Sequence, residues 1–135
     1  MRRLLPLVLA AAACGGGVGS YEEAADATVR AMQDYQAILE GITDKAAAVA
    51  AKPKIKALEE RLDEILADVK KLKEPSQEVL AKAGATIREG MYDIATKMDE
   101  NMQRLDTTPE IWPTLQDEAI ALSEKFMSLR AVLGG

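Results

Sequence analysis

The spacing of apolar residues between Ile55 and Leu72 constrains the fold of this chain more than any other feature. Six of them recur at alternating steps of three and four: Ile55, Leu58, Leu62, Ile65, Val69 and Leu72. This spacing keeps one apolar seam on one side of an α-helix for about five turns. The residues between are mostly Lys, Glu, Arg and Asp. Such a helix is not stable alone, because partner helices have to cover its seam.

Three further segments have the same repeat and can supply those partner helices. Their seams are Tyr21, Ala25, Thr28, Met32, Tyr35, Leu39 and Ile42; Leu80, Gly84, Ile87, Met91, Ile94, Met98, Asn101 and Leu105; and Leu115, Ala119, Leu122, Phe126, Leu129 and Leu133. Short breaks separate the segments, and short connections make consecutive helices antiparallel. The sequence therefore predicts an all-α domain over residues 20–135, an antiparallel up-down-up-down four-helix bundle. A three-helix bundle, or a helical hairpin that dimerises, is the alternative.

Local signals predict where these helices begin and bend. Ser20 and Glu23 have the spacing of a capping box at the first helix, and Thr107 and Glu110 have it at the last. Pro53 removes a backbone hydrogen bond inside the second helix. We therefore expect either a kink at Pro53 or a separate short helix before it, and the upstream continuation of the seam favours the kink.

Two glycines interrupt the third helix, Gly84 and Gly90. Each weakens the helix by roughly 1 kcal/mol relative to Ala. Because neither has a side chain, both would let a neighbouring helix approach closely.

The N-terminus has the pattern of an export signal. Arg2 and Arg3 precede the apolar run Leu4–Ala13. This run is too short to cross a bilayer, since a helix of that length spans only about 15 Å. It ends in small residues directly before Cys14. The arrangement resembles the lipobox of bacterial lipoprotein precursors, although that family usually has Leu where this chain has Ala11.

The resemblance implies a signal peptide over residues 1–13, cleavage before Cys14 and attachment of lipid to that cysteine. Residues 15–19 (GGGVG) are then predicted to be a flexible tether. The protein would be exported and lipid-anchored to a bacterial membrane in the cell envelope. A general secretory signal with a chance cysteine is the alternative. The mature chain also resembles the small, uncharacterised helical lipoproteins of environmental bacteria, a likeness of composition that implies no activity.

Composition excludes several classes of function. The chain has no histidine, which removes Ser–His and Cys–His catalysis, His-containing zinc sites and His-ligated haem. Its net charge is −5, and loss of Arg2 and Arg3 with the signal would make it −7. Nucleic acid is therefore a poor partner. No nucleophile–base pair is visible in the sequence, so we expect neither catalysis nor a cofactor.

A methionine stripe is the candidate for a soft metal site. Met91, Met98 and Met102 share one face of the third helix, and Met32 and Met127 could join them across the bundle. Thioethers suit Cu(I), but methionine also fills irregular gaps in protein cores. Core packing is the favoured interpretation at these positions.

Charged residues of the second helix are interpreted as a solvated surface. The acidic row comprises Glu59, Glu60, Asp63, Glu64 and Asp68. Basic residues lie between them, and carboxylates on a helix lack the loop geometry of a calcium site. Lys52, Lys54 and Lys56 surround Pro53 and could touch anionic lipid headgroups or an acidic partner. Three lysines are few for such a cluster.

The run Pro109–Trp112 (PEIW) resembles a run found before a helix in periplasmic haem-binding four-helix cytochromes. The Cys-x-x-Cys-His haem attachment of that family is absent here, so haem binding does not follow. Trp112 is predicted to pack at the start of the last helix.

Together these observations predict a lipid-anchored extracytoplasmic helical bundle that acts as a structural or protein-interaction module, with Cys14 as the lipidation site. A small-ligand or copper carrier in the cell envelope is the alternative. We expect contact with the membrane through the lipid and with a protein partner, whereas self-association as a homo-oligomer stays open.

Overall fold

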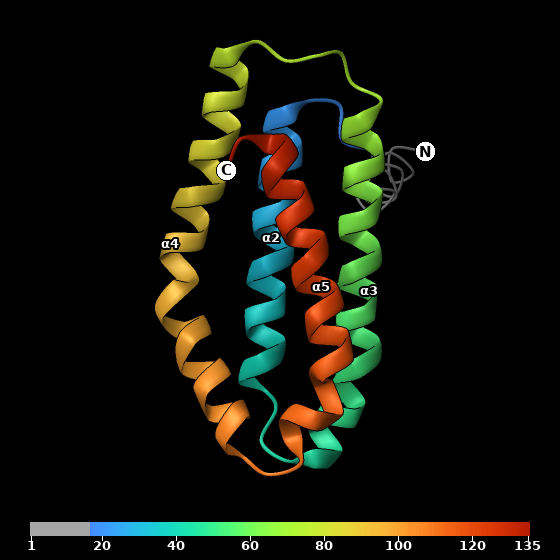
Figure 1. The fold of residues 1–135 in the computed structure, drawn as a ribbon, viewed down its shortest axis with the longest axis vertical. Coiled ribbons are helices and arrows are strands. Elements are labelled where there is room, and N and C mark those ends of the chain that lie inside the picture. Colours follow the sequence, from blue (N-terminus) through green and yellow to red (C-terminus); the bar gives the residue numbers. More distant parts are fainter. Residues whose placement is uncertain (1–16) are drawn as a thin grey trace, which may run out of the picture.

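The computed structural model describes residues 17–135 and contains four α-helices in that range. They are α2 (Tyr21–Glu40), α3 (Lys45–Lys70), α4 (Gln77–Thr107) and α5 (Ile111–Leu133). Successive helices run in opposite directions along the long axis of the molecule (Figure 1). The prediction of an all-α four-helix bundle is confirmed. The predicted signal peptide, Cys14 and the first two glycines of the tether lie outside the described residues.

Neighbouring helices in space are not always consecutive along the chain. α2 packs most extensively against α4, and α3 against α5. The two members of each of these pairs run in the same direction (Figure 1). α2 also contacts α3, and α4 contacts α5, as antiparallel neighbours. Within residues 17–135, the backbones of α3 and α4 do not approach each other although the two helices are consecutive, so they occupy diagonal positions.

The connection over residues 71–76 is long enough for this diagonal crossing. A fully extended stretch of that length spans up to about 20 Å. Diagonal helices lie only about 14 Å apart if neighbouring axes are about 10 Å apart. At its end, the hydroxyl oxygen of Ser76 accepts a hydrogen bond of 3.1 Å from the Val79 N–H and so caps α4.

The predicted seams form the core of the bundle. On α3 the buried residues are Ala48, Ala51, Ile55, Leu58, Leu62, Ile65 and Val69. On α5 they are Ile111, Leu115, Ala119, Leu122, Phe126, Leu129 and Leu133. The seam of α4 is buried less completely, because Leu80, Met91 and Met98 remain half-buried. The core is therefore least complete along α4.

The predicted N-cap of the first helix is confirmed. The hydroxyl oxygen of Ser20 accepts a hydrogen bond of 3.1 Å from the Glu23 N–H. The Glu23 carboxylate in turn accepts one of 2.7 Å from the Gly19 N–H, one residue before the position used in a standard capping box. The first turn of α2 therefore also fixes the residue that precedes its cap.

The predicted capping box of the last helix is wrong. α4 continues through Thr107, whose hydroxyl donates to the Gln103 carbonyl oxygen at 2.8 Å instead of capping the next helix. Glu110 directly precedes α5 with a positive φ of 73° and makes no side-chain cap hydrogen bond. Pro113 lies in the first turn of α5.

α3 is continuous through Pro53, which excludes the separate short helix. Its N-cap is Asp44, whose carboxylate accepts a hydrogen bond of 2.8 Å from the Ala47 N–H. Proline has no N–H, so the carbonyl group of Val49 one turn earlier loses its helical donor. Val49 is exposed, and water can take the place of that donor.

Both glycines of α4 permit the close approaches that the sequence predicted. A methyl group at Gly90 would lie 2.5 Å and 2.8 Å from the two Cγ atoms of Val29 on α2. A methyl group at Gly84 would overlap the carbonyl group of Gly134 at the end of α5. The contacts of α4 with both of its neighbours therefore depend on the missing side chains.

The burial of the α3 seam gives a first test. Leu62 is fully buried, whereas Asp63 lies at the surface and pairs with Lys125 of α5 at 2.8 Å. We expect Leu62→Asp to unfold the domain, because it buries a charge without a partner. Asp63→Ala should lower the free energy of unfolding only slightly, because exposed ion pairs contribute little. Thermal unfolding followed by circular dichroism measures both, and equal losses would mean that α3 buries another face.

The contact between Gly90 and Val29 gives a second test. Replacing a helical Gly by Ala stabilises an isolated helix by about 1 kcal/mol. Here we expect Gly90→Ala to lower the free energy of unfolding by about 1–3 kcal/mol instead, because the new methyl group overpacks the α2–α4 contact.

The matched variant combines Gly90→Ala with Val29→Ala, which removes the clashing atoms. Urea unfolding should show that Gly90→Ala costs less in this background than in the wild type. If Gly90→Ala stabilises the wild-type protein, α2 and α4 are not in close contact at this point.

Candidate functional site

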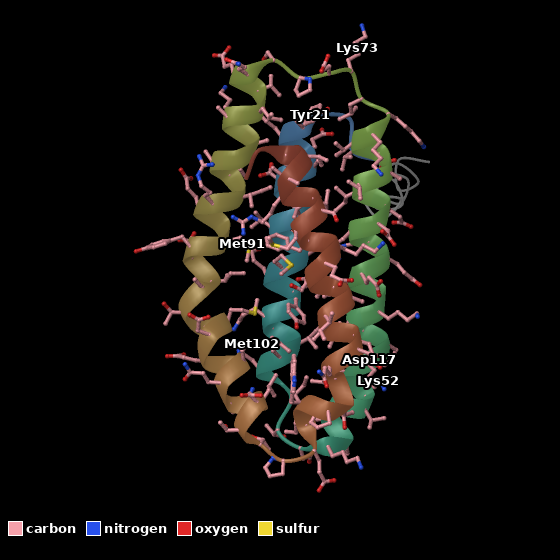
Figure 2. The ribbon with its side chains drawn as sticks, in the orientation of Figure 1. Tyr21, Lys52, Lys73, Met91, Met102 and Asp117 are labelled. Atoms are coloured by element: carbon pink, nitrogen blue, oxygen red, sulfur yellow. The ribbon has the colours of Figure 1, made fainter. Side chains whose placement is uncertain are left out.

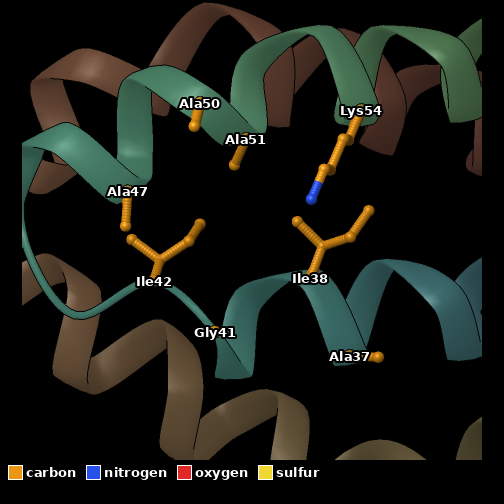
Figure 3. A pocket seen from close by; sticks show the side chains of 8 residues that line it. All are labelled: Ala37, Ile38, Gly41, Ile42, Ala47, Ala50, Ala51 and Lys54. Carbon is orange, nitrogen blue, oxygen red and sulfur yellow. The ribbon is translucent and has the colours of Figure 1, made fainter.

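A groove between the end of α2 and the beginning of α3, within the part of the chain that the structure describes, is a candidate surface for a ligand or partner. It encloses about 360 Å³. Its lining residues come from both helices and the turn between them: Ala37, Ile38, Gly41, Ile42, Ala47, Ala50, Ala51 and Lys54. Most of these side chains are small, so the facing helices leave space between them (Figure 3). The groove is wide open to solvent and mainly apolar.

The charged residue that lines this groove is Lys54. Its exposed side chain extends from α3 towards Ile38 on α2 (Figure 3). Ile38 is half-buried and Ile42 is fully buried, so the ammonium group lies beside an apolar surface. Further along the helices, Arg61 of α3 and Asp34 of α2 form an ion pair of 2.9 Å.

The three lysines around Pro53 separate in the fold. Lys52 Nζ lies 3.8 Å from a carboxylate oxygen of Glu118 on α5. Lys54 lines the groove, and Lys56 is exposed. Lys54 is therefore separated from Lys52 and Lys56, which lie four residues apart on α3 and share a face. An acidic partner in the groove would meet Lys54.

The position of α2 at this groove is fixed from the opposite side by Arg104 of α4. Its guanidinium group donates to the carbonyl oxygen of Leu39 at 2.8 Å and to that of Ile42, and to the side-chain oxygen of Asn101 at 3.1 Å. These carbonyl groups lie at the end of α2 and in the turn that follows, and that of Leu39 also accepts the Ile42 N–H at 3.2 Å. Arg104 thus holds the turn on which the groove is built. No pattern in the sequence predicts this contact, because its main acceptors are backbone atoms.

At the other end of the bundle, part of the predicted tether is held in place. The Val18 N–H donates to a carboxylate oxygen of Asp68 on α3 at 3.3 Å. The Val18 side chain is half-buried against the core, and the Gly19 N–H is bound by Glu23. Val18 and Gly19, two residues of the predicted tether, therefore make contacts with the bundle. Asp68, interpreted from the sequence as part of a solvated row, is the residue that anchors this segment.

The methionine stripe divides into packed and exposed residues. Met32 is buried on α2, and Met91, Met98 and Met102 pack against the core from half-buried positions on α4. Figure 2 shows Met91 and Met102 on the side of α4 that faces the rest of the bundle. Met127 is 56% exposed on α5, so the prediction that it could join them is wrong. The neighbouring Phe126 takes the core position instead.

The acidic row on α3 does not form a metal centre. Glu60, Asp63 and Glu64 are exposed, and Asp63 is paired with Lys125. Among the residues that the structure describes, no group of three or more His, Cys, Asp or Glu side chains is arranged to hold a metal ion. Trp112 is half-buried in the first turn of α5, as expected for a packing residue.

Two pKa shifts have structural causes. Burial raises the pKa of Tyr35 from 10.0 to about 12. The hydrogen bond to Asp63, together with the charge of that carboxylate, raises the pKa of Lys125 above its usual value. Neither group lines the groove.

Comparisons with known protein families, with curated proteins and with solved structures give no match. Between residues 17 and 135, no helix is both long and apolar enough to cross a membrane. The functional interpretation therefore depends on the residues of this chain alone.

Proposed function

We propose that this chain is a lipid-anchored, extracytoplasmic helical bundle that acts as a protein-interaction module, and that the α2–α3 groove is its interaction surface. The proposal that the groove binds a partner depends on its shape and lining: it is an open apolar hollow with Lys54 at its edge. A partner segment with a small apolar face and a nearby carboxylate would complement both features. The proposal includes no catalytic step, because the chain lacks histidine and shows no nucleophile–base pair.

The sequence before the bundle supports the anchor. The apolar run and the small residues that precede Cys14 have the order found in lipoprotein signals. One acyl chain gives only marginal membrane binding, whereas several chains hold a protein firmly. A lipoprotein of the kind this chain resembles would carry three, so its attachment would not depend on surface charge.

The groove lies at the end of the bundle opposite Val18, since α2 begins shortly after Val18 and ends at the groove. The 20 residues of α2 span about 30 Å. A lipid attached at Cys14 would therefore leave the groove on the side away from the bilayer. This placement suits an interaction module whose partner approaches from the aqueous side.

The anchor is tested by Cys14→Ser in the native host. The wild-type protein should begin at residue 14, carry lipid and stay with the membrane through a high-salt wash. The variant should lose both the lipid and the membrane retention, while its circular dichroism is unchanged because residue 14 precedes the helices. If the two proteins fractionate identically, or if the mature N-terminus lies elsewhere, the protein has no lipid anchor at Cys14 and is freely secreted.

The groove is tested by site-specific photo-crosslinking on native membranes. A photoreactive residue at position 37, an exposed alanine that lines the groove, should give an adduct with a partner protein, whereas one at the exposed position 95 of α4 should not. Ala50→Arg fills the groove from an exposed position and should abolish the adduct.

Ala95→Arg makes the same substitution at an exposed alanine of another helix and serves as the matched control, which should leave the adduct intact. Adducts that are the same at positions 37 and 95, or that survive Ala50→Arg, would contradict an interaction at the groove. A stoichiometric metal or small molecule in native mass spectrometry would favour a carrier instead.

A further inference from the structure

The contact between Val18 and Asp68 limits how far the bundle can lie from a lipid on Cys14. Val18 is fixed to α3 through its N–H and its half-buried side chain. Only residues 15–17 separate it from Cys14. The chain from Cys14 to Val18 therefore reaches at most about 14 Å when fully extended. This end of the bundle cannot move far from the membrane surface once Cys14 is lipidated.

Three lysines lie at this same end. Lys70 ends α3, and Lys71 and Lys73 follow in the connection to α4. All three are exposed. The connection closes the end of the molecule at which α2 begins (Figure 1), and Figure 2 shows Lys73 extending outward from it. Among residues 17–135, none of these lysines takes part in an ion pair with a carboxylate.

The acidic groups at this end are arranged differently. Asp68 and Glu23 turn towards the chain, where each accepts a backbone N–H from the segment before α2. Glu22 in the first turn of α2 and Glu74 and Glu78 near the start of α4 are exposed, so they equal the three lysines in number. The lysines have the longest reach of these groups, because their ammonium groups stand on four-carbon stems.

The distance between the lysine ammonium groups and the lipid headgroups decides whether the two attract each other. Exposed charges are screened beyond about 10 Å at 0.1 M salt. A lysine on a bundle held within about 14 Å of the lipid can bring its ammonium group inside that range. Lysines close to a membrane surface are attracted to anionic headgroups. The short linkage, not the net charge of the protein, makes this contact available.

We propose that the end of the bundle formed by the start of α2 and residues 70–76 is a membrane-facing surface, where Lys70, Lys71 and Lys73 contact anionic lipid headgroups. This inference depends on the proposed lipid anchor at Cys14. It adds a defined orientation: the bundle stands with this end on the bilayer and with the α2–α3 groove pointing away. The lipid holds the protein in the membrane, and the lysines set its orientation.

The test uses the full-length, lipidated protein in vesicles of phosphatidylcholine with about 30% phosphatidylglycerol, a composition that mimics a strongly charged leaflet. One donor fluorophore is placed on an introduced cysteine, either Gln77→Cys at the proposed membrane-facing end or Thr43→Cys at the groove end, both exposed. The acceptor is a headgroup-labelled lipid, and energy transfer reports the distance from the bilayer.

We expect strong transfer from position 77 and weak transfer from position 43. Replacing Lys70, Lys71 and Lys73 together by Gln should lower the transfer from position 77 at least about two-fold, as should about 0.5 M salt. The matched control replaces the exposed lysines Lys45, Lys56 and Lys97 by Gln, which changes the net charge equally and should leave the transfer unchanged. Vesicles of phosphatidylcholine alone should resemble the first triple variant.

The outcomes separate the two proposals. Absence of lipid on Cys14 overturns the anchor and, with it, this orientation. If lipid is present but positions 43 and 77 give equal transfer, or if both triple variants behave alike, the anchor stands and the membrane-facing surface is wrong.

Discussion

Each helix of this chain has one apolar seam, and the mutual burial of these seams is the interaction on which the remaining structure depends. The largest contacts form between helices that run in the same direction, α2 with α4 and α3 with α5. Close approach makes the first of these pairs possible, since Gly90 leaves room for Val29. The second pair is lined by fully buried leucine and isoleucine side chains from both helices.

This pairing gives the two ends of the bundle different structures. At one end, the connection over residues 71–76 crosses the diagonal and presents lysines, while Asp68 holds the segment that leads back to Cys14. At the other end, the tight turn between α2 and α3 is fastened by Arg104 and borders an open groove. Such a bundle is suited to attachment to a membrane at the end that holds Val18 and to binding of a partner at the end that holds the groove.

The proposed function follows from this separation along the long axis. A lipid on Cys14 would keep Val18 within about 14 Å of the lipidated residue. The groove would then face the aqueous side, with Lys54 available to a carboxylate of a partner. The half-buried methionines of α4 fit this account as packing residues, because thioether side chains fill the less complete part of the core.

The sequence by itself determined the helices, because seams and caps act within a few residues of one another. Neighbouring residues alone indicated the helical repeat from Ile55 to Leu72 and the N-cap at Ser20. They also indicated that Pro53 lies within a helical segment. Only the tertiary structure decided which helices are neighbours, that Val18 is bound by Asp68, and that Lys54 rather than Lys52 lines the groove. These outcomes depend on how side chains from distant segments fit together, and a 3.5-residue repeat makes all four seams look alike. The predicted cap at Thr107 failed for a related reason. Thr107 lies inside α4 and donates to the Gln103 carbonyl oxygen, and its spacing to Glu110 does not show where α4 ends.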